Sequence, residues 1–308
     1  MSLQSLANKI VKNPSFAIYK LKQKINNELE DIYRSVAQRN IWSKIVNQKE
    51  IRIAGLRRTG NHAIISWIQE QEQEQKQGAV FHINNVEINE NPYRYKYHNL
   101  CYHFPQYKWS IEQFKQQKIG NLTPKYCLIY SYEDYALAEV LSQKFEQKHD
   151  LYLGKTQDRY DLLIIRDPFN LLASRLKNNF LAVKSSYGNF VDLWLDYAKE
   201  YLGETNQLQH NKVCVNYNLW VNNRDYRQEI ASKLNIEFTD VGIDTVHGCG
   251  GGSSFDGREF DGQAKKMDVN NRWKHYLEDP TYRQLINNEQ LLEYSHKIFG
   301  HIPGTEKI

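Results

Sequence analysis

Eight residues, GLRRTGNH at positions 55–62, combine two glycines with several side chains that donate hydrogen bonds. The apolar run IRIAG (51–55) precedes them and a helical pattern begins at Asn61, so they form a turn between a strand and a helix. At such a turn successive backbone N–H groups and the positive helix end converge on one point, which favours an anion. We therefore expect an anion-binding loop made by Arg57, Arg58, Thr59, Gly60, Asn61 and His62.

The residues missing from this turn restrict which anion it can hold. A nucleoside triphosphatase uses a lysine after the second glycine for the outer phosphates and the adjacent hydroxyl for magnesium. Asn61 and His62 stand at these two positions, which disfavours metal-assisted triphosphate chemistry, and no metal is expected. A smaller, metal-free group is a better match, and one candidate is the 5′-phosphosulfate of 3′-phosphoadenosine 5′-phosphosulfate (PAPS).

A second motif, LLIIRDPFNLLASRLK (162–177), repeats the arrangement of a strand followed by a helix. The strand ends in Arg166, Asp167 is placed to cap the helix, and Pro168 suits its first turn. Ser174 follows two turns along the helix. A guanidinium and a hydroxyl both donate hydrogen bonds to a terminal phosphate. Such helix starts are common, so this motif alone is weak evidence for a phosphate site. The evidence is stronger because it follows the first motif along the chain.

A third candidate is the glycine-rich segment 247–266. Glycine runs are typical of flexible surface loops, and this one also offers Ser253, Ser254 and Arg258 as hydrogen-bond donors. The stretch from Asn270 to Leu285 reads as helical, and its basic start adds Arg272 and Lys274.

These motifs lie in an alternation of strands and helices. Helices are expected from Asn61 to about Glu70 and from about Asn222 to Leu234, and the polar run 69–77 reads as a solvated helix end and linker. Unbroken apolar runs indicate strands covered on both faces, hence an α/β fold with a central parallel sheet flanked by helices. The expected strands are 51–55, 79–84, 126–131, 161–166 and 212–217.

Segment 85–125 has little periodicity and many aromatic residues, together with His98 and His103. Irregular insertions after a strand commonly build ligand pockets, while aromatic packing against the core is the alternative. Both interpretations remain open from the sequence.

Residues 1–48 read as an N-terminal helical arm, followed by an α/β domain over 49–308. The arm has apolar residues at three- and four-residue intervals, and Pro14 separates its main helix from a shorter one. Five lysines and no acid among the first 27 residues would suit a membrane surface or a partner. A helix packed on its own domain is the favoured interpretation. The apolar positions are Leu21, Ile25, Leu29, Ile32 and Val36.

Composition narrows the function classes. The 308 residues carry a formal net charge of +4, which is too mild to demand nucleic acid but suits anionic ligands. No apolar run reaches membrane-spanning length and no signal peptide is evident, which predicts a cytoplasmic protein. The cysteines form no paired spacing and are expected to be free thiols, and no oligomeric state is predicted. They are Cys101, Cys127, Cys214 and Cys249.

The turn 55–64, GLRRTGNHAI, resembles the 5′-phosphosulfate loop of the sulfotransferase family. This resemblance implies a P-loop-like sulfotransferase architecture, PAPS as donor, and Arg58 in place of the family's usual lysine. Arg166 and Ser174 match the family's 3′-phosphate motif. The C-terminal segment loosely matches the loop that closes over the nucleotide in this family, without the stricter lysine-arginine-glycine pattern. The resemblance makes Ser253, Ser254, Arg258, Arg272 and Lys274 the matching candidates. In total the resemblance covers residues 50–300.

The acceptor and the general base are less defined. A small molecule or a sugar is the expected acceptor, at a hydroxyl or an amine. The stretch YSYEDY (130–135) ends the third strand and offers Glu133 and Asp134, of which Glu133 is the expected base. His82, His98 and His103 are competitors. Related enzymes use either a His or a Glu. The alternatives to a sulfotransferase are a nucleotide or small-molecule kinase with a degenerate P-loop and an inactive nucleotide-binding module.

Overall fold

The computed structural model describes residues 14–75, 80–246, 248 and 251–307. The chain forms two compact units, and each draws on three segments of the sequence. Unit 1 comprises Met1–Val46, Glu90–Pro124 and Lys144–Thr156, and unit 2 comprises Asn47–Asn89, Lys125–Gln143 and Gln157–Ile308.

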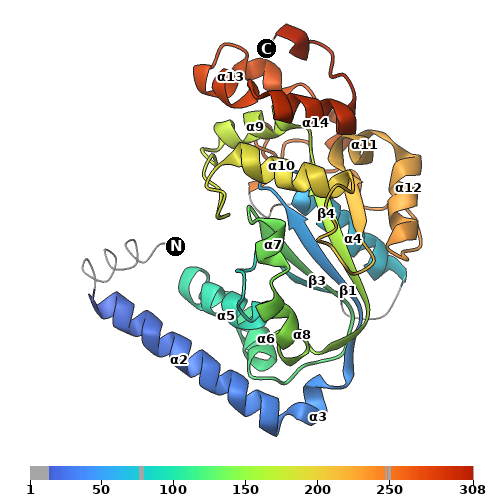
Figure 1. The fold of residues 1–308 in the computed structure, drawn as a ribbon. Helices are drawn as coiled ribbons and strands as arrows, with labels where there is room; N and C mark the ends of the chain where they lie inside the picture. Colours follow the sequence, from blue (N-terminus) through green and yellow to red (C-terminus); the bar gives the residue numbers. More distant parts are fainter. Residues whose placement is uncertain (1–13, 76–79, 247, 249–250, 308) are drawn as a thin grey trace. The chain divides into compact units, whose positions relative to one another are not determined.

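Unit 2 contains the sheet that the apolar runs predict. Five strands lie in the order β2-β3-β1-β4-β5, and the recorded pairs β1/β3, β2/β3 and β4/β5 are parallel. The α/β class and the central parallel sheet are therefore confirmed (Figure 1). The strands are β1 (Ile45–Gly55), β2 (Val80–Ile83), β3 (Lys125–Glu133), β4 (Lys155–Ile165) and β5 (Val213–Asn216).

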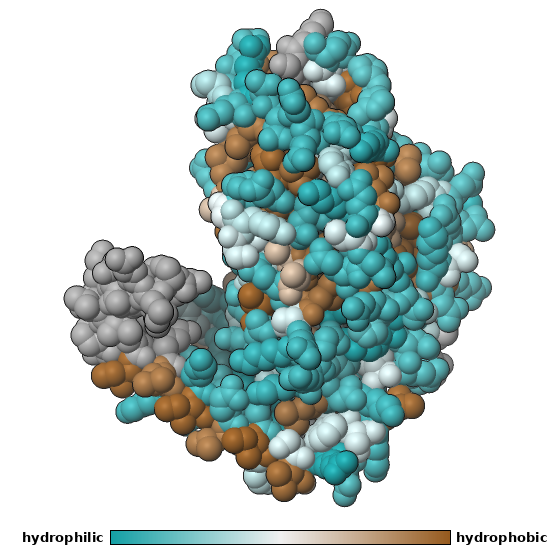
Figure 2. Space-filling model, viewed as in Figure 1, coloured by the Kyte–Doolittle hydropathy of each residue, from teal (hydrophilic) through white to brown (hydrophobic). Residues whose placement is uncertain are grey.

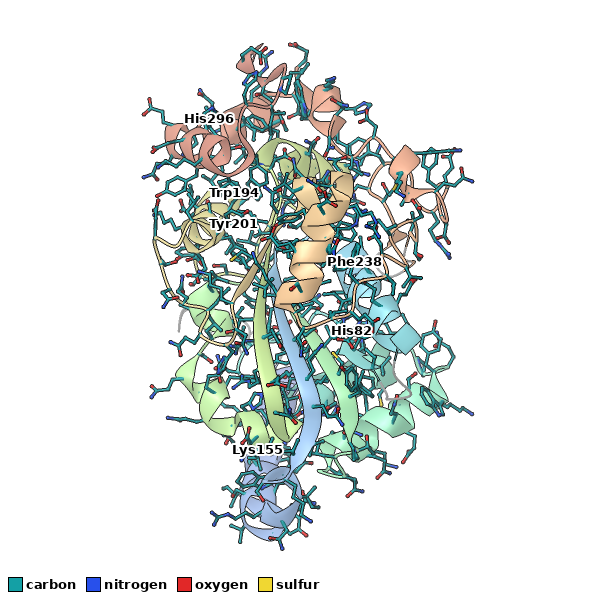
Figure 3. All side chains as sticks on the ribbon, turned by 90° about the vertical axis from the view of Figure 1, so that its right-hand side faces the viewer. His82, Lys155, Trp194, Tyr201, Phe238 and His296 are labelled. Atoms are coloured by element: carbon teal, nitrogen blue, oxygen red, sulfur yellow. The ribbon has the colours of Figure 1, made fainter. Side chains whose placement is uncertain are left out.

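Both faces of this sheet are buried, as continuous apolar strands require. In β4, Leu162 and Ile164 join one apolar cluster while Leu163 and Ile165 join the other. Helices cover the sheet on both sides (Figure 3). One cluster includes α4 (Asn61–Gln75), α11 (Tyr217–Asn222) and α12 (Arg224–Lys233); the other includes α7 (Leu137–Val140), α9 (Pro168–Lys177), α10 (Phe190–Tyr201), α13 (Pro280–Ile286) and α14 (Glu289–Phe299).

Helix α4 corrects one expectation. The polar run 69–77 was expected to be a solvated helix end, but α4 continues to Gln75, and Gln71 and Glu72 are buried. Glu72 is buried because Lys49 of β1 approaches its carboxylate to 2.6 Å. The polar composition of this segment does not by itself show that a side chain of opposite charge lies on the neighbouring strand.

Unit 1 is helical. The segment 85–125, expected to be irregular, instead contributes two helices, because Asn91 caps the first of them by accepting from the backbone N–H groups of Tyr93 and Arg94. The helices of this unit are α2 (Pro14–Ala37), α3 (Arg39–Trp42), α5 (Pro92–His103), α6 (Lys108–Lys118) and most of α8 (Gln143–Leu153).

Helix α2 confirms the helical arm but not the way it was expected to pack. Leu21, Ile25 and Leu29 are each more than half exposed, and so are Ile32 and Val36. The apolar face is therefore not the face that attaches the helix to its own unit. The short helix expected before Pro14 lies outside the described residues.

Two further observations concern the described part of the chain. None of its helices is long and apolar enough to cross a membrane. Cys101, Cys127 and Cys214 are free thiols, and Cys249 lies outside the described residues.

Candidate anion-binding site

The candidate site lies where the chain changes direction across the sheet of unit 2. After β1 the chain continues to the β2/β3 side, and after β4 it continues to β5 on the other side. Ligands of doubly wound sheets bind at the carboxyl ends of the strands at such a point. The loop after β1 (residues 56–60) and Arg166, which follows β4, flank this position.

The loop after β1 is shaped by its two glycines. A Cβ atom at Gly55 would lie 2.2 Å from Oδ1 of Asn61, so a larger residue would displace that side chain. Gly60 has φ 99°, and a Cβ atom there would lie 2.1 Å from the ring of Tyr217. Both positions require glycine for space, and Gly60 requires it also for its left-handed backbone. Arg58 lies in the left-handed region as well, with φ 72°.

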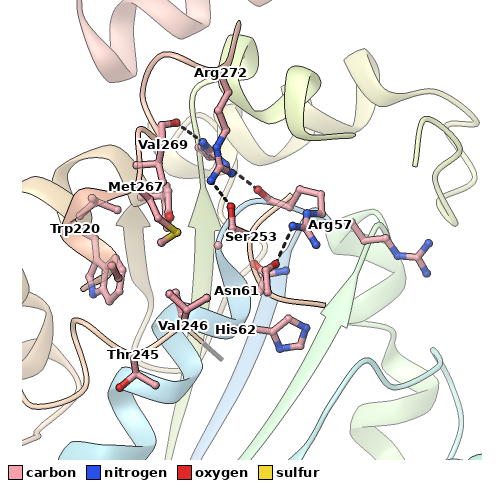
Figure 4. Close-up of a pocket in the computed structure, with 18 of the residues that line it drawn as sticks. Arg57, Asn61, His62, Trp220, Thr245, Val246, Ser253, Met267, Val269 and Arg272 are labelled. Carbon is pink, nitrogen blue, oxygen red and sulfur yellow. Dashed lines mark hydrogen bonds between the residues drawn. The ribbon is translucent and has the colours of Figure 1, made fainter. Parts of the chain in front are cut away.

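A cavity of about 420 Å³ opens over this loop (Figure 4). That volume lies within the range of small-ligand sites. Its walls come from the loop after β1, the ends of β3 and β4, helix α11 and the C-terminal segment 243–272. The lining includes Arg57, Arg58, Gly60, Asn61, His62, Asn84, Asn85, Glu133, Arg166, Phe180, Tyr217, Trp220, Ser253, Met267, Val269 and Arg272.

Arginine side chains converge on one side of the cavity. Arg166 donates to the carbonyl of Arg58 (3.1 Å) and that of Val269 (2.5 Å), and approaches Ser174 Oγ at 3.5 Å. Its guanidinium lies over the ring of Tyr217, 5.0 Å from the centroid. These contacts join the loop after β1 to the end of β4.

Arg272 and Arg58 complete this group. Arg272 donates to Ser174 Oγ (3.4 Å) and Ser253 Oγ (2.6 Å), and pairs with Asp256 at 3.2 Å. Arg58 donates to the carbonyl of Gly252 (3.0 Å). We call Arg58, Arg166 and Arg272 the arginine cluster. Its recorded partners are mostly carbonyl and hydroxyl oxygens rather than carboxylates.

Two of these guanidinium groups, those of Arg272 and Arg58, have lowered pKa values. Burial, together with the charges of Arg166 and Arg58, lowers the pKa of Arg272 to about 10, although Tyr217 and Asp256 oppose the shift. Burial also lowers the pKa of Arg58, followed by the charge of Arg166, although Glu133 opposes the shift. An anion placed among them would relieve this repulsion.

Unpaired polar atoms lie beside the cluster. Thr59 Oγ1, Arg166 Nε and Arg272 Nε are buried and have no hydrogen-bond partner among the described atoms. Buried polar atoms in folded proteins are nearly always paired, so each calls for an explanation. The donor set of arginines, hydroxyls and the loop's N–H groups fits a ligand with two anionic ends, as the PAPS expectation requires.

Glu133 also lines the cavity. It is the last residue of β3 and accepts from Asn61 Nδ2 at 3.1 Å, while Arg57 Nε lies 3.8 Å from its carboxylate. Asp134 accepts from the backbone N–H of Arg57 (2.9 Å) and pairs with Arg175 at 2.7 Å. These contacts hold Glu133 beside the loop after β1.

Part of the lining is apolar. Trp220 and Met267 lie on the left of the pocket in Figure 4, and Val246 lies near the centre, beside His62. Trp220 stacks on Tyr217 with their ring centroids 6.0 Å apart. A flat apolar group fits this part of the lining, because aromatic side chains offer faces for stacking.

The expected site residues divide into three sets. Thr59 and Ser174 are buried next to the cavity, and Ser174 bonds to two cluster arginines. Three expected residues are not among the lining residues: His82, Ser254 and Arg258. His82 lies within β2 (Figure 3). Arg258 pairs with Asp261 at 2.6 Å. The lining residues are Arg57, Arg58, Gly60, Asn61, His62, Glu133, Arg166 and Ser253.

Three further observations bear on the expectations. His98 and His103 belong to α5 of unit 1, and the aromatic segment contributes no residue after Asn85 to the lining described here. No group of three or more metal-ligating side chains occurs among the described residues. Asp167 caps α9 as expected, accepting from Asn170 N at 2.8 Å.

The sequence did not point to the residues that brace the loop. The Asp134–Arg175 pair joins the end of β3 to α9, and Tyr217 fills the space left by Gly60. Tyr217 directly follows β5, so its place at the carboxyl edge of a predicted strand was a usable signal. Nothing local distinguishes Arg175 from a surface arginine.

The fold and the site together define a parallel α/β protein with a cavity that is lined in part by arginine side chains. No family model and no curated protein matches the chain. Among solved structures it is similar to mouse sulfotransferase SULT7A1 complexed with PAP, at 12% identity over 84% of this chain and 92% of that one, with a TM-score of 0.42. Retinol dehydratase in complex with retinol and PAP matches at 12% identity over 84% of each chain, with a TM-score of 0.40.

Proposed function

We propose that the chain is a sulfotransferase that moves a sulfuryl group from PAPS to a hydroxyl or amine of a small molecule or sugar. The observation that carries this proposal is the arginine cluster at the carboxyl edge of the sheet. The recorded hydrogen-bond partners of its three cations are mainly neutral oxygens, with Asp256 beside Arg272 as the recorded acid, and the adjoining turn lacks the lysine and hydroxyl of a magnesium-dependent triphosphate site. A nucleotide with two anionic ends that binds without a metal satisfies both facts.

The cluster supplies two separate roles. Arg166 and Ser174, with Arg272, hold the 3′-phosphate, which does not react. Arg58 and the N–H groups of residues 58–62 hold the phosphosulfate. The apolar wall with Trp220 and Met267 accommodates the adenine ring. PAPS supplies an activated sulfuryl group joined to a phosphate by one bridging oxygen.

Transfer requires a proton to leave the acceptor. The acceptor oxygen or nitrogen bonds to sulfur while its proton passes to the Glu133 carboxylate, and the bond from sulfur to the bridging oxygen breaks. Adenosine 3′,5′-bisphosphate leaves with the bonding pair, and Arg58 stabilises the charge on that oxygen. Asn61 keeps Glu133 in place through its 3.1 Å hydrogen bond.

A thermal-shift measurement tests the donor assignment. Adenosine 3′,5′-bisphosphate should raise the melting temperature in the presence of a chelator. At a hundred times Kd it should add about 2.7 kcal/mol of stability. Stabilisation by ATP only with magnesium, and none by the bisphosphate, would support the kinase alternative instead.

A further inference from the structure

Helix α2 carries a continuous apolar stripe on its exposed side. The stripe residues follow one another at intervals of three and four, which keeps them on one face of a helix. Their exposed fractions run from 51% to 78%. Figure 2 shows the stripe as a row of brown atoms along α2. We define the α2 stripe as Ile18, Leu21, Ile25, Leu29, Ile32 and Val36.

The opposite face of α2 is charged, and it attaches the helix to unit 1. Asp31 pairs with Arg94 (2.7 Å) and Lys148 (3.0 Å) and accepts from Tyr152 Oη at 2.8 Å. Arg34 donates to the carbonyl of Lys118 (3.2 Å). Burial raises the pKa of Asp31, but Arg94, Lys148 and Tyr152 outweigh burial and lower it. The helix thus buries its ionic face and exposes its apolar one.

The unit that contains α2 is strongly basic and exposes many hydrophobic residues. Unit 1 holds 16 Lys and Arg against 7 Asp and Glu, a net charge of +9, while unit 2 holds 24 against 29, a net charge of −5. Of the 20 large hydrophobic residues recorded as exposed, 14 lie in unit 1, which has less than a third of the chain. Exposed apolar surface and positive charge therefore occur in the same unit.

We propose that unit 1 binds the surface of an anionic lipid bilayer, with the α2 stripe inserted among the headgroups and acyl chains. Helices that lie in a membrane surface combine an apolar face with lysines, and Lys22 and Lys24 are exposed on α2. Anionic headgroups attract a unit of charge +9. The unit also exposes the aromatic residues Tyr102, Phe104, Tyr107 and Trp109, which suit the interface.

A second copy of the chain fits the same stripe less well. Two units of charge +9 would repel each other, and the acids of α2 are already paired, Glu28 with Lys148 (3.0 Å) and Asp31 with Arg94. These pairs leave few acids on α2 to attract the lysines of another copy. Charge complementarity therefore favours a lipid surface over self-association.

Co-sedimentation of the full chain with vesicles tests this inference. The wild type should bind phosphatidylcholine vesicles that contain 30% phosphatidylserine, and 0.5 M salt should weaken this binding. Leu21→Glu/Ile25→Glu should lower the partition coefficient at least tenfold, because two stripe residues become charged. Lys22→Glu/Lys24→Glu should lower it to a smaller extent.

Matched controls separate the stripe from general effects of added charge. Leu219→Glu/Leu292→Glu places the same two charges at exposed leucines of unit 2 and should leave vesicle binding unchanged. All variants should keep the wild-type melting temperature, since the altered residues are exposed. Absent binding to anionic vesicles, or equal binding by Leu21→Glu/Ile25→Glu, overturns the proposal. A concentration-dependent dimer that this variant abolishes, without vesicle binding, would assign the stripe to a second copy.

Discussion

Strand β1 and the loop that follows it differ in how their basic side chains are paired. Within the strand, Lys49 pairs with Glu72 at 2.6 Å, and Arg52 pairs with Asp161 at 2.8 Å. A few residues later Arg58 joins a cluster whose recorded partners are mainly neutral oxygens, and the charge of Arg166 contributes to lowering the pKa of both Arg58 and Arg272.

Under the proposed function, the difference is one between charges that are paired within the fold and charges that pair with the bound anion. A buried ion pair that lacks one partner destabilises the fold, because the remaining charge is desolvated. Cations that repel one another in the free protein are stabilised when an anion binds among them, and this stabilisation contributes to the affinity for the anion. Substitutions in the strand should therefore change stability, and substitutions in the cluster should change binding or turnover.

The largest effect is expected at Glu133, which lies beside the cluster but also contacts Asn61 and Arg57. Glu133→Gln keeps the shape and removes the basicity. Sulfuryl transfer to an acceptor found by screening with labelled PAPS should fall by about 10²–10⁴-fold. Bisphosphate binding, measured by calorimetry, should persist. Near-normal turnover in this variant would eliminate Glu133 as the base and make His62, which also lines the cavity, the next residue to change.

Arg52→Met should cost about 3–5 kcal/mol of unfolding free energy, because it leaves Asp161 buried without its cation. Urea denaturation measures this cost. The matched variant Arg58→Met should change stability much less, since it removes a cation that its neighbours repel. If the two variants lose equal stability, the distinction between the strand and the loop is wrong.

Two cluster arginines should differ in the step that they affect. Arg166→Ala should mainly weaken bisphosphate binding, by about 1.5–3 kcal/mol for one charge-assisted contact. Arg58→Ala should lower kcat by about 10²–10³-fold with a smaller change in affinity, because leaving-group charge is greatest in the transition state. Identical kcat losses with donor affinity intact in both would contradict these separate roles.

The smallest effect concerns pH. Burial raises the pKa of Asp161, but His210 and Arg52 outweigh burial and lower it to about 2. A carboxyl whose pKa is lowered in the folded state adds stability above its unfolded pKa, and this stability is lost as the pH falls through about 2. We expect the wild type to lose about 2 kcal/mol between pH 5 and 2 from this group. Asp161→Asn lacks this titration, so a parallel loss in that variant would exclude the group as the cause.

The sequence predicted the strands and the start of helix α9, because apolar runs and helix N-caps are signals that depend on neighbouring residues. All five strands occur near their expected positions, and Asp167 and Pro168 begin α9 as expected. The loop after β1 was predicted from its glycines and its donors. These features depend on residues within one turn of each other.

Other features depend on residues far apart in the chain. The sequence cannot show that Lys49 will bury Glu72, that Arg175 will pair with Asp134, or that the charged face of α2 will attach it to unit 1. Periodicity predicted that α2 has an apolar face but not which way that face points. Such facts follow from tertiary pairing, which composition and spacing do not contain.

The backbone of Arg58 has a consequence for natural variation. At φ 72° an arginine is less favourable than glycine by about 1–2 kcal/mol, and asparagine also tolerates this conformation. If the guanidinium at position 58 were not needed for function, glycine or asparagine would therefore be expected to replace this arginine over time. Across homologous chains, a basic residue at position 58 should mark those that still catalyse the transfer, and glycine should mark those that have lost it.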